Sequence, residues 1–266
     1  MQSGEGNFKD GTGTYIDLYE NDQIRVEANF KDRAGVYKSY YENGQLQVKS
    51  TYKDGKKDGI WKQYYREGQL ESEGNFINSN KDGMWDFFQE NGYYRRKDNF
   101  KKGLLEGLSK EYYKNGRLSS EGIYKDDEKE GVWKQYYEDG ILKEEKSFNR
   151  GIVNGVWKQY YPNGQLKVKL FTKELSEEEK AYNKYFAVSI KYNSYGEFKY
   201  YYKNGQLLVN GFYSKDGHEQ RLKKGLPRRL PTGVWRWYAE DGQLEFEGSH
   251  SEGVKAGMNN YRKGIF

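Results

Sequence analysis

The chain has 266 residues, a formal net charge of +5 and no cysteine. The lack of cysteine excludes a disulfide framework, a thiolate metal site and a cysteine nucleophile, and the mild charge does not by itself indicate a nucleic acid or a membrane. Only 35% of the residues are hydrophobic and 32% are charged, a composition too polar for a thick core. However, 17% are aromatic, whereas disordered chains contain few aromatic residues. This balance indicates a thin β-sheet, one layer deep, with rings on both faces.

The first residues, Met1 to Gly6, contain no basic and apolar signal region. The segment from Glu5 to Gly11 is similar to the second half of a repeat, as in Glu73 to Phe76. We therefore expect a chain cut from a longer precursor, either cytoplasmic or secreted with its signal peptide removed. No apolar run of about 18 residues is present, so no transmembrane segment is expected.

One unit of 24 residues recurs about nine times. It begins at a glycine, as in Gly59-Ile60-Trp61-Lys62-Gln63-Tyr64-Tyr65. The equivalent glycines are Gly13, Gly35, Gly59, Gly83, Gly107, Gly131, Gly155, Gly196 and Gly233, with a degenerate tenth start at Gly257. Such self-similarity predicts a repeat architecture whose units stack on their neighbours.

Each unit is predicted to be a β-hairpin. An Asn-Gly or Asp-Gly dipeptide, such as Asn163-Gly164 or Asp241-Gly242, separates two strand-like runs in most units. This dipeptide favours a two-residue type I′ turn, because both central residues need a positive φ. The predicted fold class is all-β: tandem antiparallel hairpins in one elongated, twisted, open sheet, with a short helical insertion.

A two-residue turn also predicts the strand register. It places Lys62 opposite Glu73 and, with the charges swapped together, Asp86 opposite Lys97. Opposite charges across strands stabilise a sheet by roughly 0.2–1 kcal/mol per pair. The other predicted pairs are Lys110 with Glu121, Lys134 with Glu145 and Arg236 with Glu247, whereas Lys38 with Lys49 and Lys158 with Lys169 break the rule.

The same register predicts which residues share a face. One face should carry Trp61, Gln63, Tyr65, Leu70 and Phe76, and the other Lys62, Tyr64, Glu71 and Glu73. The first is expected to be the better buried. Tyr65 should lie opposite Leu70, and Trp61 should cover the bare backbone of Gly74.

Two longer gaps, from Gly155 to Gly196 and from Gly196 to Gly233, interrupt the repeat. The predicted layout is hairpin repeats over 1–170, an insertion with a short helix over 171–195, the eighth repeat over 196–213, a basic loop over 214–232, and the last repeat with a C-terminal cap over 233–266. The regular repeats then serve as scaffold, and residues 172–237 are the expected working region.

The first insertion predicts a helix starting at Ser176. Ser176 and Glu179 have capping-box spacing, and Tyr182, Tyr185 and Phe186 form an apolar stripe. The stripe either packs on the sheet or faces a partner.

The second insertion is a basic loop. Its cations are Arg221, Lys223, Lys224, Arg228 and Arg229. They form either a patch for phosphate, acidic protein or a lipid headgroup, or a solvated loop.

Between the insertions, aromatic residues replace the Gln63-type position. Tyr200 and Trp237 stand there, with Tyr202 and Trp235 nearby. Aromatic residues are favoured as binding anchors, although the inserted helix could equally cover them.

Units such as Gly155 to Leu166 (Gly-Val-Trp-Lys-Gln-Tyr-Tyr-Pro-Asn-Gly-Gln-Leu) resemble MORN repeats, and most of all the variant in bacterial proteins labelled YwqK-type antitoxins. The resemblance covers nearly the whole chain. It implies stacked antiparallel hairpins, a bacterial source, and binding and blocking of a toxin. It supplies no catalytic residue.

No enzymatic chemistry is expected. His218 and His250, the only histidines, fit no metal spacing or triad, and the carboxylates recur in every unit as charge pairs. We expect no cofactor and no metal. The leading hypothesis is that the chain is a scaffold that binds another protein, with an antitoxin or immunity protein as the specific form of this hypothesis. The alternative is a secreted or surface protein that contacts host or envelope protein, glycan or anionic lipid. Nucleic acid is not expected, and self-association through a sheet edge stays open.

Overall fold

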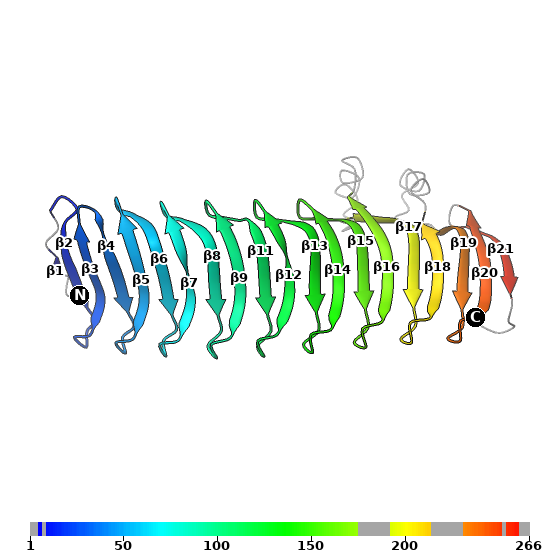
Figure 1. The fold of residues 1–266 in the computed structure, drawn as a ribbon, viewed down its shortest axis with the longest axis horizontal. Helices are drawn as coiled ribbons and strands as arrows, with labels where there is room; N and C mark the ends of the chain where they lie inside the picture. The colour runs from blue at the N-terminus through cyan, green and yellow to red at the C-terminus, as the bar shows by residue number, and fades with distance from the viewer. Residues whose placement is uncertain (1–4, 7–8, 175–191, 214–230, 252–253, 261–266) are drawn as a thin grey trace. The chain divides into compact units, whose positions relative to one another are not determined.

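The computed structural model describes residues 5–6, 9–174, 192–213, 231–251 and 254–260 (Figure 1). The chain divides into two compact units, Met1–Glu128 and Lys129–Phe266. The described residues contain strands and no helix. The all-β prediction is therefore confirmed, whereas the helix expected from Ser176 lies outside the described residues.

Unit 1 is an antiparallel sheet in which successive strands pair, except that the short β10 and the strand β11 after it both pair with β9. Its strands are β1 (Glu5–Gly6), β2 (Gly13–Leu18), β3 (Ile24–Lys31), β4 (Ala34–Tyr40), β5 (Leu46–Lys53), β6 (Lys56–Tyr64), β7 (Leu70–Ile77), β8 (Asn80–Phe88), β9 (Tyr94–Lys101), β10 (Leu104–Leu105), β11 (Gly107–Tyr112) and β12 (Leu118–Lys125).

Unit 2 repeats the same arrangement. Its strands are β13 (Glu128–Tyr136), whose first residue belongs to unit 1, β14 (Leu142–Asn149), β15 (Ile152–Tyr160), β16 (Leu166–Glu174), β17 (Tyr192–Tyr201), β18 (Leu207–Tyr213), β19 (Pro231–Tyr238), β20 (Leu244–Ser251) and β21 (Val254–Asn260). β21 contains Gly257 and pairs with β20, as expected of a tenth repeat start.

The turn prediction is wrong at the Asn-Gly sites. Gly44 has a φ of 81°, but Asn43 is not among the residues with positive φ. The Gly44 amide donates to the Tyr41 carbonyl (2.8 Å) and the Tyr41 amide to the Gln45 carbonyl (2.8 Å). This is a type I turn followed by a glycine bulge. Type I′ geometry instead joins successive hairpins, as at Asp32 and Arg33, with φ values of 51° and 64°.

The longer turn explains why the predicted register is right in mid-strand and wrong beside the turn. Lys62 does lie opposite Glu73, but Tyr64, rather than Tyr65, lies opposite Leu70. A second irregularity, between Gln63 and Tyr64, restores the mid-strand register. The other pairs predicted from the sequence also occur: Asp86 with Lys97, Lys110 with Glu121, Lys134 with Glu145, Arg236 with Glu247, Lys38 with Lys49 and Lys158 with Lys169.

We call the side of each sheet that bears Trp61 and its aligned residues the tryptophan face, and the opposite side the lysine face. The bulge moves Leu70 to the lysine face, opposite Tyr64, and brings Glu71 to the tryptophan face, where it accepts a hydrogen bond from Gln63 (2.7 Å). Both assignments from sequence were therefore wrong. The burial prediction is confirmed, because the buried apolar side chains, such as Trp85 and Trp133, lie on the tryptophan face.

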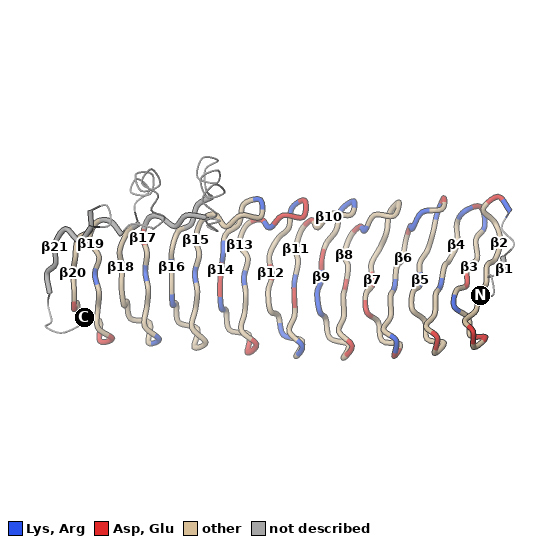
Figure 2. The backbone as a smooth tube through the Cα atoms, turned by 180° about the vertical axis from the view of Figure 1, so that it is seen from behind, with Lys and Arg blue, Asp and Glu red and all other residues tan. Residues whose placement is uncertain are grey.

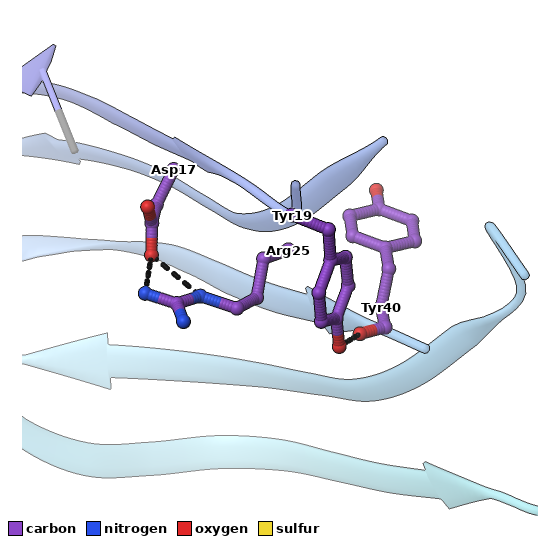
Figure 3. A network of polar contacts seen from close by, with 4 residues as sticks. All are labelled: Asp17, Tyr19, Arg25 and Tyr40. Carbon is purple, nitrogen blue, oxygen red and sulfur yellow. Dashed lines mark hydrogen bonds and ion pairs between the residues drawn. The ribbon is translucent and has the colours of Figure 1, made fainter. Parts of the chain in front are cut away.

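A ladder of tyrosines joins successive hairpins. The Tyr19 hydroxyl donates to the Tyr40 carbonyl (2.7 Å), near an ion pair between Asp17 and Arg25 (Figure 3). The same contact recurs from Tyr41 to Tyr64, Tyr65 to Phe88, Tyr137 to Tyr160, Tyr161 to Tyr201 and Tyr202 to Tyr238, at 2.8–2.9 Å. Each bond satisfies a carbonyl of the next hairpin, so the ladder fixes the spacing of the repeats within each unit.

Candidate functional site

Of the four aromatic residues expected to gather in the eighth and ninth hairpins, Trp235 and Trp237 lie against each other. Trp235 on β19 lies 5.9 Å from Phe198 on β17 and 6.0 Å from Trp237, measured between ring centroids. Trp237 packs edge-on against Phe246 on β20 at 4.7 Å. Such pairs contribute about 0.5–1.5 kcal/mol beyond the area that they bury.

A glycine lets the central ring of this cluster lie against the strand before it. A Cβ at Gly211 would come within 2.1 Å of the Trp235 ring. The indole nitrogen donates to the Phe212 carbonyl at 3.2 Å, and Trp235 is buried. Trp235 is thus an anchor of the cluster, whereas Trp237 and Phe246 keep part of their surface in solvent.

Tyr200 and Tyr202 lie in different surroundings. Tyr200 lies between Val168 and Val209 in the same cross-strand row as Trp237. Burial, and then the Tyr200 hydroxyl, raise the pKa of the neighbouring Tyr161. Tyr202 instead uses its hydroxyl in the tyrosine ladder. Val209 thus separates Tyr200 from Trp237 in this row, and Tyr202 is part of the tyrosine ladder.

The five cations proposed as a basic patch, Arg221, Lys223, Lys224, Arg228 and Arg229, lie outside the described residues. They remain predictions.

A second aromatic cluster, in the fourth hairpin, was not anticipated. Trp85 is 1% exposed and packs against Phe87, Phe100 and Phe76. Its ring lies over Gly74, where a Cβ would come within 2.2 Å. Trp61 was predicted to cover Gly74; it lies directly opposite in the strand pairing, but the covering ring is that of the following hairpin.

A lysine lies over the rings of this cluster. Lys81 Nζ is 4.2 Å from the Trp85 ring centroid and 4.9 Å from that of Phe100. Burial, and then the nearby Arg96 charge, lower the pKa of Lys81. The same arrangement recurs where Lys57 lies over Trp61 (4.1 Å) and Lys129 over Trp133 (4.0 Å). Cation–π contacts of this kind contribute about 0.5–2 kcal/mol.

Beside this cluster lies a buried carboxylate. The Asp98 side chain is fully buried, accepts a hydrogen bond from Ser109 (2.8 Å) and has Arg96 Nε 2.6 Å away. Burial raises the pKa of Asp98, and Ser109 and Arg96 oppose that shift. Asp98 occupies the repeat position that Gly74 holds in the third hairpin. No other hairpin has an aspartate at this position.

In unit 2 a polar network occupies the equivalent positions of the sixth and seventh hairpins. Glu144 is buried and lies 2.8 Å from Lys146. It accepts hydrogen bonds from the Trp157 indole (2.8 Å) and the Gln159 amide (3.1 Å). Burial opposes ionisation, but these donors together lower the pKa of Glu144. Within the described part of the chain, no group of three or more histidine, aspartate or glutamate side chains could hold a metal ion.

Comparison with known proteins identifies the repeat. The sequence pattern described as "MORN repeat variant" matches eight segments that together span more than half of the chain: 12–32, 33–54, 57–78, 105–126, 129–150, 153–174, 195–215 and 231–251. The chain belongs to the MORN repeat variant family. The resemblance to MORN repeats seen in the sequence is thereby confirmed, and the chain is a repeat scaffold.

The other comparisons add little. No curated protein matches the chain. A solved structure titled "Crystal Structure of TcdB2-TccC3" is 9% identical with a TM-score of 0.22, and the match covers 92% of this chain but only 15% of that one. Among the described residues, no helix is long and apolar enough to cross a membrane.

The family pattern leaves out residues 79–104, which hold Trp85 and Asp98. The sequence carried a signal of this departure in the swapped pair Asp86 and Lys97. Phe87, at the position of Gln63, was a further one.

Proposed function

We propose that this MORN repeat chain is a non-enzymatic scaffold that binds a partner protein, and that the partner is a toxin which it neutralises. The observation that supports protein binding is a row of large apolar side chains on the lysine face of unit 1. Ile60 is 56% exposed, Met84 67% and Leu108 51%. They occupy the same repeat position on β6, β8 and β11. Asn75 lies opposite Ile60 and Asn99 opposite Met84, whereas Leu108 lies opposite Ile123, which is 50% exposed. Large apolar side chains gathered on an exposed face are typical of interaction surfaces.

The polar chemistry of the described residues supports the non-enzymatic part of the proposal. The two buried carboxylates with shifted pKa values, Asp98 and Glu144, are each engaged by side chains of their own or neighbouring strands. Such contacts hold a carboxylate in the sheet rather than present it to a substrate.

The experiment is a protection assay. Cells that express toxins encoded beside the gene are grown with and without this chain, and binding of the purified pair is measured by calorimetry. We expect growth to be restored and the two proteins to bind. Failure to bind or protect against any such toxin would refute the antitoxin function.

The second candidate is a secreted or surface protein that contacts envelope glycan or anionic lipid. The partly exposed rings of Trp237 and Phe246 favour it, because sugars bind on aromatic rings. A glycan array and a vesicle-binding assay separate this candidate from the first. A native N-terminus carrying a signal peptide would also favour it.

A further inference from the structure

A row of residues, most of them charged, runs across the lysine face of each unit at mid-strand; Ile16 and Asn210 are uncharged members of it. Figure 2 shows the acidic and basic positions along the successive hairpins. In most hairpins the second strand supplies an acid to this row, and the first strand a lysine or arginine. The second-strand acids are Glu27, Glu73, Glu121, Glu145 and Glu247. All of these acids except Glu27, which lies opposite Ile16, face a base across their own hairpin.

Lys49 and Lys169 depart from this pattern, since each stands where another hairpin has glutamate. Lys49 lies between Lys38 and Lys62 on the adjacent strands. Lys169 likewise lies between Lys158 and Lys199. Directly opposite residues in antiparallel strands are about 5 Å apart, so each unit holds three cations in consecutive strands. Like charges so placed destabilise a sheet.

The outer lysines of both triplets are neutralised by acids. In unit 1, Lys38 pairs with Glu27, and Lys62 pairs with Glu73 at 2.9 Å. In unit 2, Lys158 pairs with Glu145 at 3.0 Å, and Lys199 with Glu197 at 2.7 Å.

A tyrosine completes the same arrangement in each unit. The Tyr40 hydroxyl donates to Glu27 (2.8 Å), and the Tyr160 hydroxyl to Glu145 (3.2 Å). The two triplets therefore have closely similar surroundings, although they lie in different units.

The central lysines have no such partner. Among the described residues, no carboxylate lies within ion-pair distance of Lys49 or Lys169. Both side chains are exposed, whereas the outer four lysines are partly buried. Each triplet thus presents one exposed, uncompensated positive charge with two anchored cations beside it.

We infer that Lys49 and Lys169 are carboxylate-receiving sites, where an acidic segment of the partner protein docks on the lysine face. This inference rests on the proposed function and names the surface and the chemistry of the partner. The flanking glutamates would repel a continuous polyanion such as nucleic acid or an anionic bilayer, but leave room for an isolated carboxylate. Apolar neighbours fit such a segment: Ile60 is two residues before Lys62, and the exposed Phe171 is two residues after Lys169.

The test uses the full chain and a fluorescent peptide in which glutamates are separated by leucine and serine. A matched peptide has glutamine in place of glutamate. The wild-type chain should bind the glutamate peptide, more weakly as salt rises, and should not bind the glutamine peptide. The double variant Lys49→Glu with Lys169→Glu should bind about tenfold more weakly, as expected for losing close charge pairs.

Thermal unfolding separates a lost site from a damaged fold. In the double variant each new glutamate faces two lysines, as Glu145 does, so the melting temperature should not fall. The control is Lys114→Glu with Lys203→Glu, which makes the same change of net charge at exposed positions in the Asn-Gly turns. Its affinity should stay within about twofold of wild type.

Three results would overturn the inference. The first is equal affinity of the Lys49–Lys169 variant and wild type. The second is an equal loss in the control pair, which would show a general charge effect. The third is binding to phosphatidylserine vesicles that depends on both lysines and is tighter than to the peptide, which would assign the surface to lipid.

The same variants separate this inference from the proposed function. If a toxin binds the Lys49–Lys169 variant as tightly as wild type, the docking surface is wrong and the protein-binding function stands. If the peptide binds through the lysines but no toxin is neutralised, the docking surface is supported and the antitoxin function fails.

Discussion

Trp85 in unit 1 and Trp157 in unit 2 occupy the same position of the repeat, yet their surroundings differ. Around Trp85 the neighbours are Phe76, Phe87 and Phe100, and the ring lies on Gly74. Around Trp157 the neighbours are polar. Lys146 stands where Trp85 has Gly74, Glu144 where it has Ser72, and Gln159 where it has Phe87. These three side chains and the Trp157 indole form a network of hydrogen bonds and an ion pair.

A cation lies over the tryptophan in both places, but it comes from a different strand. The cation over Trp85 is Lys81. The position equivalent to Lys81 beside Trp157 is Val153, and the cation there is Lys146, 4.6 Å from the ring centroid. Both hairpins have the same register, and in both a tyrosine of the preceding hairpin donates to the carbonyl at the same repeat position. The backbone frame is therefore held by turns and ladder, and the tryptophan face can change its chemistry from one repeat to the next.

The largest expected effect comes from removing the ring in the apolar environment. Trp85→Ala should lower the free energy of unfolding by about 3–5 kcal/mol, because a buried tryptophan leaves a cavity. Trp157→Ala should cost less, about 1–3 kcal/mol, because the half-buried ring is replaced in part by water and one hydrogen bond to Glu144 is lost. Urea unfolding of both variants measures the difference. Equal losses would contradict the contrast between the two hairpins.

The two buried carboxylates should respond to pH in opposite directions. The pKa of Glu144 is lowered, so its stabilisation is complete above the ordinary carboxyl range and is lost as pH falls through the folded-state value. The pKa of Asp98 is raised, so stability falls as pH rises from the ordinary range through its folded-state value.

Conservative amide variants test these slopes. The stability deficit of Glu144→Gln relative to wild type should shrink on acidification. The unfolding free energy of Asp98→Asn should rise relative to that of wild type as pH rises from the ordinary carboxyl range through the folded-state pKa of Asp98. Unfolding free energies measured across this range check both, and slopes of the same sign would contradict the assignment.

The ladder should contribute equally wherever it occurs. Tyr65→Phe removes one hydroxyl bond to the Phe88 carbonyl and should cost about 1 kcal/mol. Tyr65→Gln should retain most of that stability, because Gln89, at the equivalent position, donates to the Tyr113 carbonyl at 2.8 Å. A larger loss in Tyr65→Gln than in Tyr65→Phe would show that the ring, not the hydrogen bond, holds the repeats together.

These features differ in how far the sequence could predict them. Mid-strand register followed from charge complementarity between Lys62 and Glu73, a local pattern repeated in phase. The turn type did not, because Asn-Gly suits both a two-residue turn and a glycine bulge, and only backbone geometry separates them. The bulge then moved Leu70 and Glu71 to the faces opposite to those predicted.

Contacts between hairpins were harder to predict than contacts within them. Lys38, which faces Lys49 within its own hairpin, pairs with Glu27 of the preceding hairpin, a contact that the pattern within one unit does not contain. Likewise, Trp85 covers Gly74 from the next hairpin. The aromatic residues at Tyr200, Trp235 and Trp237 could be found from sequence, since they replace a polar residue at a known phase, but their packing required the cross-strand neighbours Phe198 and Phe246.

The smallest expected effect concerns the swapped pair of the fourth hairpin. Asp86 faces Lys97 but also lies opposite Glu73, and Lys97 also lies opposite Lys110. Lys97→Glu alone should leave stability within about 0.2–1 kcal/mol of wild type, because it makes the contact with Asp86 repulsive but the contact with Lys110 attractive.

The double variant Asp86→Lys with Lys97→Glu restores the order of charges found in the neighbouring hairpins. All three contacts along the row then join opposite charges, so the double variant should be more stable than both Lys97→Glu and wild type. Thermal unfolding at low and high salt checks this, and a double variant no more stable than Lys97→Glu would contradict it. If the double variant is the more stable, the wild-type order of Asp86 and Lys97 does not serve stability. It would then serve the surface that the fourth hairpin presents, as Lys49 and Lys169 do in the hairpins before and after it along the chain.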